Sequence, residues 1–268
     1  MDSSRNDHTA LAELLADNGF VAADEEANEL LARAAGDPEL LVALVERRLT
    51  GEPLAWITGT VEFCGLPVHV DPGVYPPRWQ TEPVARRAVE RLTDAGTAVD
   101  VCTGAGAIAL TLSANRPHAR VVATDLDERA VACARRNGVD ARQGDLFEPL
   151  PPDLAGRVDL VVGAVPYVPT SELSLLQRDT LTFESPLSYD GGPDGADLLR
   201  RAVGGAPRLL RAGGTLLLEL GAGQPGLLRP DLDRLGYRDV AVIHDEDGDV
   251  RGIEATLGSS SREVPIID

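Results

Sequence analysis

The apolar residues in the first fifth of the chain recur at the spacing of amphipathic helices. Between residues 9 and 50, leucine, valine and alanine follow one another at intervals of three and four residues. Asp37 and Pro38 supply a cap and a first-turn signal for one of these helices. We therefore expect a small helical domain over residues 1–55.

An extended pattern replaces the helical one from Trp56 to Pro77. Isolated apolar residues alternate there with turns rich in glycine and proline. Such punctuation is typical of short strands joined by tight turns. Residues 56–80 are therefore expected to form a β-hairpin linker.

From Glu82 onward, short apolar segments alternate with helical ones. Strands are expected at 98–101, 121–124, 158–162 and 215–219, and helices at 84–92, from 107, at 128–137 and at 196–210. This alternation is typical of a parallel sheet with helices on both faces.

Two further apolar segments, at 239–244 and 251–257, are separated by an acidic turn. They predict a closing antiparallel hairpin. We expect the α/β domain to span residues 81–258 and residues 259–268 to form a flexible tail.

Composition and charge narrow the possible partners. The 268 residues include 43 acidic and 25 basic ones, all 25 basic residues are arginine, and the net charge is -18. Because phosphate backbones are bound mainly by clustered Lys and Arg, no nucleic-acid partner is expected.

No apolar run approaches the roughly 20 residues of a membrane-spanning helix, and the first residues lack the pattern of a secretory signal. The three cysteines show neither disulfide nor zinc spacing, so we expect a cytoplasmic protein with no membrane partner and no metal.

A glycine-rich turn follows the strand expected at 98–101 and leads into a helix. It reads Cys102-Thr103-Gly104-Ala105-Gly106. A turn of this kind lets a ligand approach bare backbone, which predicts a nucleotide site. The pattern does not separate a dinucleotide from an adenosyl ligand, and an ordinary tight turn is the alternative.

Acidic residues stand at the ends of two further strands. Asp125 can accept both hydroxyl protons of a ribose. A helix N-cap is the alternative role for Asp125, although Asp127 can fill it instead. Asp145 follows a third strand end and suits the amino group of an adenine, with Leu146 as an apolar wall. We expect these three strand ends to converge on one crevice.

Several sequence blocks stand in order along nearly the whole chain. They cover residues 48–59, 62–65, 71–82, 102–106, 159–169, 183–186 and 190–195. In this order they resemble the class I S-adenosylmethionine-dependent methyltransferases and, more narrowly, the HemK-type protein-(glutamine N5) methyltransferases that modify peptide release factors. The resemblance implies an α/β fold with a seven-stranded Rossmann-like sheet, a C-terminal antiparallel hairpin and a small N-terminal helical domain. It also implies S-adenosyl-L-methionine as the cofactor and methyl transfer to a nitrogen.

The resemblance assigns roles to residues of this chain. The cofactor would lie against Cys102, Thr103, Gly104, Ala105, Gly106, Asp125, Leu126, Asp145 and Leu146. The acceptor nitrogen would be held at Ala164, Val165, Pro166 and Tyr167. Arg78 and Glu82 resemble a charged block that could line the substrate, with a surface pair at a helix start as the alternative.

Two positions depart from the family's pattern. Cys102 stands where the family usually has the first glycine of the turn, and we expect it to be a small buried hydrophobe and not a reactive thiol. Ala164 stands where the family has the Asn of Asn-Pro-Pro-Tyr, whose side-chain oxygen is thought to hold the amide nitrogen. Loss of one preorganised polar group is expected to cost roughly 2.7 to 4 kcal/mol in transition-state stabilisation.

The acceptor is therefore expected to be a protein or a small molecule. The main hypothesis is an N-methyltransferase of the release-factor type. The alternatives are a small-molecule N-methyltransferase acting on an amino acid or a guanidine group, with Ala164 making room, and a catalytically impaired protein that binds S-adenosylmethionine. A nicotinamide oxidoreductase is disfavoured by the later blocks and by the final hairpin.

Overall fold

The computed structural model of the protein describes residues 2–176 and 178–259. The flexible tail expected at the C-terminus lies, from residue 260 onward, outside the described residues.

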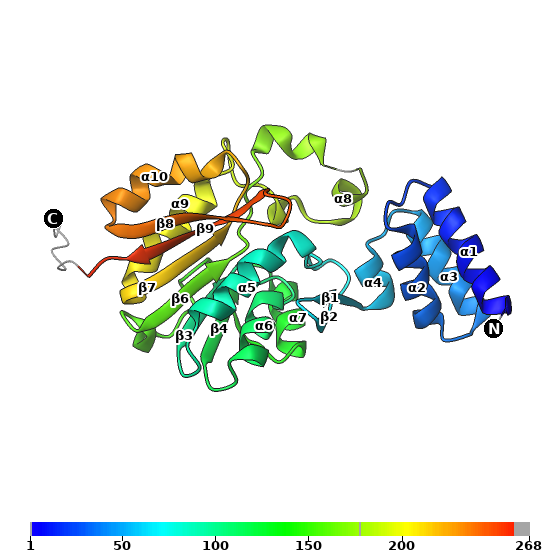
Figure 1. The fold of residues 1–268 in the computed structure, drawn as a ribbon, viewed down its shortest axis with the longest axis horizontal. Coiled ribbons are helices and arrows are strands. Elements are labelled where there is room, and N and C mark those ends of the chain that lie inside the picture. Colours follow the sequence, from blue (N-terminus) through cyan, green and yellow to red (C-terminus); the bar gives the residue numbers. More distant parts are fainter. Residues whose placement is uncertain (1, 177, 260–268) are drawn as a thin grey trace.

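Four helices at the N-terminal end share a core of their own. They are α1 (Asp2–Asp17), α2 (Ala23–Ala34), α3 (Pro38–Leu49) and the short α4 (Leu54–Thr58). Leu15, Leu30 and Ile57 are buried together in this core. The carboxylate of Asp37 accepts hydrogen bonds from the backbone N–H groups of Glu39 and Leu40, which confirms the predicted cap. Figure 1 shows the bundle at one end of the molecule.

A two-stranded hairpin joins this bundle to the rest of the chain. Strands β1 (Thr60–Phe63) and β2 (Leu66–His69) pair antiparallel. Phe63 and Val68 are buried in the same cluster as Leu160 and Leu217 of the large sheet. The hairpin is therefore packed onto the α/β unit.

The large sheet has seven strands in the order β5-β4-β3-β6-β7-β9-β8. These are β3 (Thr97–Val101), β4 (Arg120–Asp125), β5 (Asp140–Gln143), β6 (Val158–Gly163), β7 (Leu210–Glu219), β8 (Tyr237–His244) and β9 (Val250–Leu257). The first five in spatial order run parallel, and β9 is antiparallel to both β7 and β8. The parallel sheet and the closing hairpin are thus confirmed.

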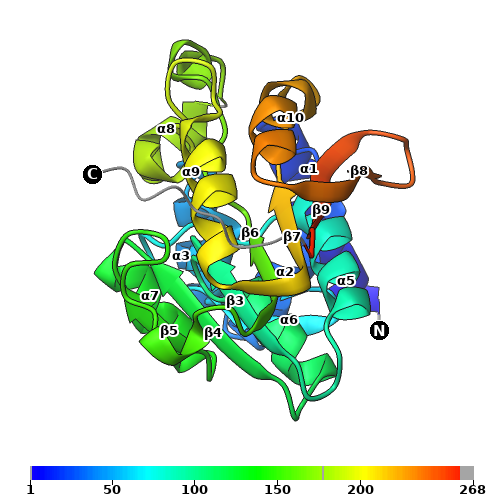
Figure 2. The same ribbon diagram turned by 90° about the vertical axis from the view of Figure 1, so that its left-hand side faces the viewer.

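Helices cover both faces of this sheet (Figure 2). One face carries α5 (Glu82–Arg91), α6 (Ala107–Asn115) and α7 (Glu128–Arg136), and the other carries α9 (Asp197–Gly205) and α10 (Gln224–Arg234). A short α8 (Arg178–Phe183) and the 3-10 turns at Trp79–Thr81, Pro152–Leu154, Thr170–Leu175, Pro186–Ser188 and Ala206–Arg208 complete the elements.

One predicted helix is too long. The helix expected at 196–210 ends at Gly205, because Pro207 has no N–H to continue the α-helical pattern. Strand β7 consequently begins at Leu210, five residues earlier than expected.

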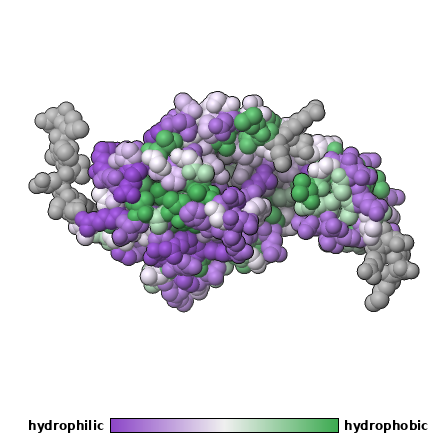
Figure 3. Space-filling view, turned by 45° about the horizontal axis from the view of Figure 1, so that its top comes forward, coloured by the Kyte–Doolittle hydropathy of each residue, from purple (hydrophilic) through white to green (hydrophobic). Residues whose placement is uncertain are grey.

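One face of the molecule is mainly polar. On the face shown in Figure 3, hydrophilic residues dominate and hydrophobic ones gather in separate patches. Among the described residues, none of the helices is both long and apolar enough to cross a membrane.

The chain adds β4 and β5 on one side of β3 and then crosses to add β6 and β7 on the other side, so the order in which strands are added reverses between β3 and β6. In open α/β sheets, ligands bind at the carboxyl ends of the strands next to such a reversal. The glycine-rich turn follows β3, and residues 164–167 follow β6. The fold therefore brings both segments to the same edge.

Candidate active site

A cavity of about 590 Å³ lies at this edge of the sheet. It brings together ten of the predicted site residues: Cys102, Gly104, Asp125, Leu126, Asp145, Leu146, Ala164, Val165, Pro166 and Tyr167. They come from the ends of β3, β4, β5 and β6. The three acidic and glycine-rich strand ends thus converge on one crevice, as expected.

Five predicted residues do not line this cavity. Thr103, Ala105 and Gly106 belong to the glycine-rich turn but are not in the cavity wall. A Cβ on Gly106 would come within 3.0 Å of Ala134, so this glycine allows the start of α6 to pack against α7.

The two charged residues expected near the substrate lie elsewhere. Glu82 accepts a hydrogen bond from the backbone N–H of Cys64 at 3.0 Å and pairs with Arg86 at 2.6 Å. Arg78 pairs with Glu184 at 2.5 Å. For Glu82 the arrangement matches the alternative of a surface pair at the start of a helix.

The glycine-rich turn has a conformation that strains a side chain. Cys102 has a φ of 56°, in the left-handed region that favours glycine. Burial, followed by the charges of Asp125 and Asp100, raises the pKa of the Cys102 thiol. The thiol is therefore neutral, which fits the expected small hydrophobe.

Asp125 is held by backbone groups on both of its oxygens. Oδ2 accepts from the N–H of Gly104 at 2.8 Å, and Oδ1 accepts from the N–H of Asp127 at 3.0 Å. Burial raises the pKa of Asp125, and these two hydrogen bonds oppose the shift. Asp127 caps α7 by accepting from the N–H of Arg129, so the cap does not require Asp125. Each oxygen of Asp125 keeps a lone pair for a ligand.

The loop after β6 is fixed from several sides. The Tyr167 hydroxyl donates to Oε1 of Glu219 at 3.0 Å, and the Tyr167 carbonyl accepts from Nε2 of Gln224 at 2.6 Å. A Cβ on Gly195 would lie 2.3 Å from the Tyr167 carbonyl oxygen, and one on Gly191 would lie 2.8 Å from Tyr167 Cα. Both glycines are therefore needed for the segment 190–195 to approach this loop.

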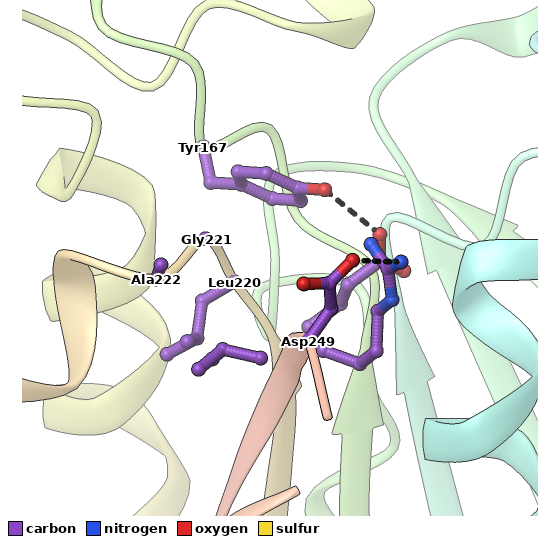
Figure 4. A pocket seen from close by; sticks show the side chains of 8 residues that line it. Tyr167, Leu220, Gly221, Ala222 and Asp249 are labelled. Carbon is purple, nitrogen blue, oxygen red and sulfur yellow. Dashed lines mark hydrogen bonds and ion pairs between the residues drawn. The ribbon is translucent and has the colours of Figure 1, made fainter. Parts of the chain in front are cut away.

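A second, smaller cavity of about 230 Å³ shares a wall with the first. Tyr167 and Glu219 line both cavities. Figure 4 shows the Tyr167 ring above Leu220 and Asp249, with its hydroxyl bonded to the carboxylate that ends β7. The hydrogen-bonded pair Tyr167–Glu219 thus forms part of the partition between the two spaces.

Sequence reasoning missed three groups of polar residues at the site. Asp100 is buried beneath the turn, where its Oδ2 accepts from the Thr103 hydroxyl at 2.6 Å. Glu219 lines the cavity from β7, and Tyr189 lines it and donates to Glu184. A single carboxylate in an otherwise apolar strand was the signal available for Asp100 and Glu219.

A cluster with metal-ligating atoms was also missed. The ligand atoms of His69, Asp71 and Cys133 lie within 4.8 Å of one another. Asp71 is already paired with Arg136 at 2.6 Å and with His69 at 2.9 Å. The Asp71 carboxylate is therefore already paired with the charged Arg136. These contacts join the end of the β1–β2 hairpin to α7.

The sequence is similar to those of known methyltransferases along most of the chain. A family model described as a methyltransferase small domain matches residues 66–162. The release factor glutamine methyltransferase of Geobacter sulfurreducens is 39% identical over 231 residues, which cover 83% of this chain and 80% of that protein. The 4-amino-L-phenylalanine/4-methylamino-L-phenylalanine methyltransferase of Streptomyces pristinaespiralis is 40% identical over 200 residues, which cover 69% of this chain and 68% of that protein.

Among solved structures, the E. cuniculi Mtq2-Trm112 complex matches with a TM-score of 0.53 and 24% identity, over 70% of this chain and 99% of that chain. This likeness shows a shared fold. Together, the fold and the cavity define an S-adenosylmethionine-dependent methyltransferase. The chain belongs to the release factor glutamine methyltransferase family, as the sequence blocks predicted.

Proposed function

We propose that this enzyme transfers a methyl group to an amine nitrogen, which is more nucleophilic than the glutamine amide of a release factor. The observation that carries the proposal is the side chain at position 164. Ala164 lines the cavity directly after β6, and its side chain has no polar atom. An amide nitrogen, whose lone pair is delocalised, needs acceptors that orient it, whereas an amine needs less help.

The cavity fits S-adenosylmethionine on its β3–β5 side. A Cβ placed on Gly104 would meet only the Tyr75 carbonyl oxygen, at 3.8 Å, so the turn presents open backbone to a ligand. Asp125 would accept from the ribose hydroxyls. Leu146 is an apolar wall for the adenine, and Asp145, held by Arg201 at 2.7 Å, keeps its other oxygen for the amino group.

The chain's own contribution to the reaction is mainly positioning. The cofactor supplies a methyl carbon bonded to a positively charged sulfur. A displacement at such a carbon needs the nucleophile, the carbon and the leaving sulfur in line, and correct placement lowers the barrier substantially. The hydrogen bond from Gln224 to the Tyr167 carbonyl and the close approach of Gly191 and Gly195 to Tyr167 support such placement, because they hold the end of this loop at the cavity wall.

One relative supports an amine acceptor. The Streptomyces pristinaespiralis relative, whose printed name gives an amino-substituted phenylalanine as the substrate, has 40% identity over 69% of this chain, against 39% over 83% for the Geobacter sulfurreducens enzyme. The family's sequence framework is therefore compatible with a small amine.

Release-factor glutamine is the second candidate acceptor. The identity of 39% over 83% of the chain favours it. In this case the Val165 carbonyl and Tyr167 would have to hold the amide without a side chain at 164.

The charge of the protein supports a protein or small-molecule acceptor over a nucleic acid. A net charge of -18 repels phosphate backbones. We also propose a cytoplasmic location, where release factors and metabolic amines are both present.

A methyl-transfer assay with labelled cofactor tests the proposal. The acceptors are a release factor, 4-amino-L-phenylalanine and a set of primary amines, with products identified by mass. We expect label in an amine and little or none in the release factor. Efficient labelling of release-factor glutamine with no labelled amine would overturn the proposal.

A further inference from the structure

Glu219 occupies the position beside the expected acceptor site. Strands β6 and β7 are parallel neighbours, and the last pair in their register is Gly163 with Leu218. Ala164 and Glu219 are the next residues on each strand, and both line the large cavity. The carboxylate of Glu219 therefore stands next to the position that lacks a polar side chain.

The Glu219 carboxylate is buried and only partly hydrogen-bonded. The residue is 6% exposed. Its Oε1 accepts from the Tyr167 hydroxyl at 3.0 Å, and the Thr81 hydroxyl is close enough to lower the pKa of the carboxyl group. Its Oε2 has no partner at normal hydrogen-bonding geometry among the described residues. A buried oxygen without a donor is costly, and this cost is removed when a ligand supplies the donor.

Three tyrosine rings line the same cavity. They belong to Tyr75, Tyr167 and Tyr189. The rings of Tyr75 and Tyr189 are 5.4 Å apart, edge to face. Burial raises the pKa of Tyr75 to about 12 and also raises the pKa of the other two, so the rings are neutral near pH 7. Neutral aromatic faces attract cations, especially ammonium groups.

We propose that Glu219 and these three rings bind the acceptor as a protonated amine, and that the Glu219 carboxylate removes its proton before methyl transfer. This inference rests on the proposed function, because it assumes an amine acceptor. It adds a substrate class, a cationic alkyl amine, and a proton acceptor for the reaction.

The proposed transfer conserves atoms, electrons and charge when S-adenosylmethionine is the methyl donor. An ammonium nitrogen has no free lone pair, because all its electron pairs are in bonds. One N–H bond breaks, its proton moves to Glu219, and its electron pair stays on nitrogen. That pair forms the new bond to the methyl carbon while the carbon–sulfur bond breaks and leaves its electrons on sulfur. The products are a methylated ammonium, S-adenosylhomocysteine and a protonated Glu219, which returns its proton to solvent.

Several groups around Glu219 shift the pKa of its carboxyl group and so affect its ability to accept a proton. Burial raises its pKa, while the hydroxyls of Thr81 and Tyr167 and the charge of Arg251 lower it. Arg251 is itself paired with Asp245 and Asp249, the latter in the wall of the second cavity. Tyr75 is close enough to interact with Glu219 and with both members of the ion pair Arg78–Glu184. A proton acceptor is most effective when its pKa lies close to the working pH.

Two isomeric amines of the same size test the inference by calorimetry on the protein saturated with S-adenosylhomocysteine. Phenethylamine is a cation near neutral pH, whereas para-ethylaniline is neutral. We expect Glu219→Gln to weaken phenethylamine binding about 10-fold or more, the loss expected for one charge-assisted hydrogen bond. Binding of para-ethylaniline should change less than about two-fold, because a neutral amine gains little from a carboxylate. The matched control, Glu246→Gln, makes the same change in charge at an exposed position on the β8–β9 turn and should leave both affinities unchanged.

A second variant tests the protonation of the Glu219 carboxylate. Tyr167→Phe keeps the ring but removes the hydroxyl that lowers the pKa of Glu219. Phenethylamine binding, which weakens as Glu219 becomes protonated in acid, should therefore begin to weaken at a higher pH in this variant. An unchanged pH dependence contradicts the role of Glu219.

Other outcomes also overturn the inference. These are equal losses for both amines in Glu219→Gln, no loss for either, or no binding of phenethylamine to the unaltered enzyme. Methylation of release-factor glutamine is measured separately and bears on the proposed function alone. A failure of the inference can therefore be distinguished from a failure of the proposed function.

Discussion

Ala164 and Glu219 are neighbours at the carboxyl ends of two parallel strands, one residue beyond the pair Gly163 and Leu218. The resemblance predicts an amide side chain directly after β6, and Ala164 has only a methyl group there. The adjacent strand supplies a carboxylate with one unpartnered oxygen. The polar side chain beside position 164 thus comes from β7 and not from the segment after β6.

Restoring the missing amide should restore activity on an amide. We expect Ala164→Asn to raise methylation of release-factor glutamine by about 10² to 10³, the effect of one preorganised polar group. Initial rates with labelled cofactor measure this. Affinity for S-adenosylhomocysteine should stay the same in the variant. If the unaltered enzyme already methylates the glutamine at a rate that the variant does not improve, the interpretation of position 164 is wrong.

Asp125 should determine cofactor affinity. Asp125→Asn keeps the size of the side chain but replaces charged acceptors for the ribose hydroxyls. Because hydrogen bonds to charged groups contribute about 1.5 to 3 kcal/mol, affinity for S-adenosylhomocysteine should fall about 10- to 150-fold. Calorimetry decides this, and NAD should bind to neither form. Asp153→Asn, at an exposed carboxylate away from the cavity, serves as the control.

Asp100 should make stability depend on pH. Burial raises the pKa of Asp100 from its ordinary value of 3.8 to about 7, so the native state binds this proton more tightly than the unfolded chain does. The stabilisation is complete in acid and is lost as pH rises from 3.8 towards about 7. At about 1.4 kcal/mol per pKa unit, the total change is up to about 4 kcal/mol.

Urea unfolding of the native protein and of Asp100→Asn measures this effect. Asn does not titrate, so the variant should gain stability relative to the native protein as pH rises from 3.8 to about 7. A difference that stays constant over this range would show that Asp100 does not titrate as described.

The N-terminal helices should matter for the acceptor and not for the cofactor. They have their own core, and none of the described side chains of α1, α2 and α3 lines the large cavity. Deleting residues 1–50 should therefore leave the affinity for S-adenosylhomocysteine within about two-fold and abolish transfer, if these helices help to bind the acceptor. Full transfer by the shortened chain would exclude that role.

The central strands could be predicted closely from the sequence. The expected bounds of β3, β4 and β6 agree with the structure to within one residue at each end. These strands are covered on both faces, so their sequences are nearly continuous apolar runs. The edge strand β5, with the polar sequence DARQ, was inferred only from its end at Gln143. An edge strand has a single neighbour and needs fewer apolar residues.

The site could be predicted only where it follows the strand ends. Parallel strands end at one edge, so Asp125 and Asp145 had to lie close together. The pair Arg78–Glu184 joins residues 106 positions apart through a segment without helical or strand periodicity. Nothing in the local sequence indicates such a contact, and only the folded chain reveals it.

The fixed backbone around Tyr167 has a consequence for how this family diverges. Gln224 and the glycines at 191 and 195 hold the main chain of the acceptor loop in place. The side chain at 164, which lines the cavity, can then be exchanged while the main chain is held in place. Under the proposed function, one substitution at this position would change which nitrogen is accepted, so a new specificity would arise during evolution while the fold and the cofactor site are inherited intact.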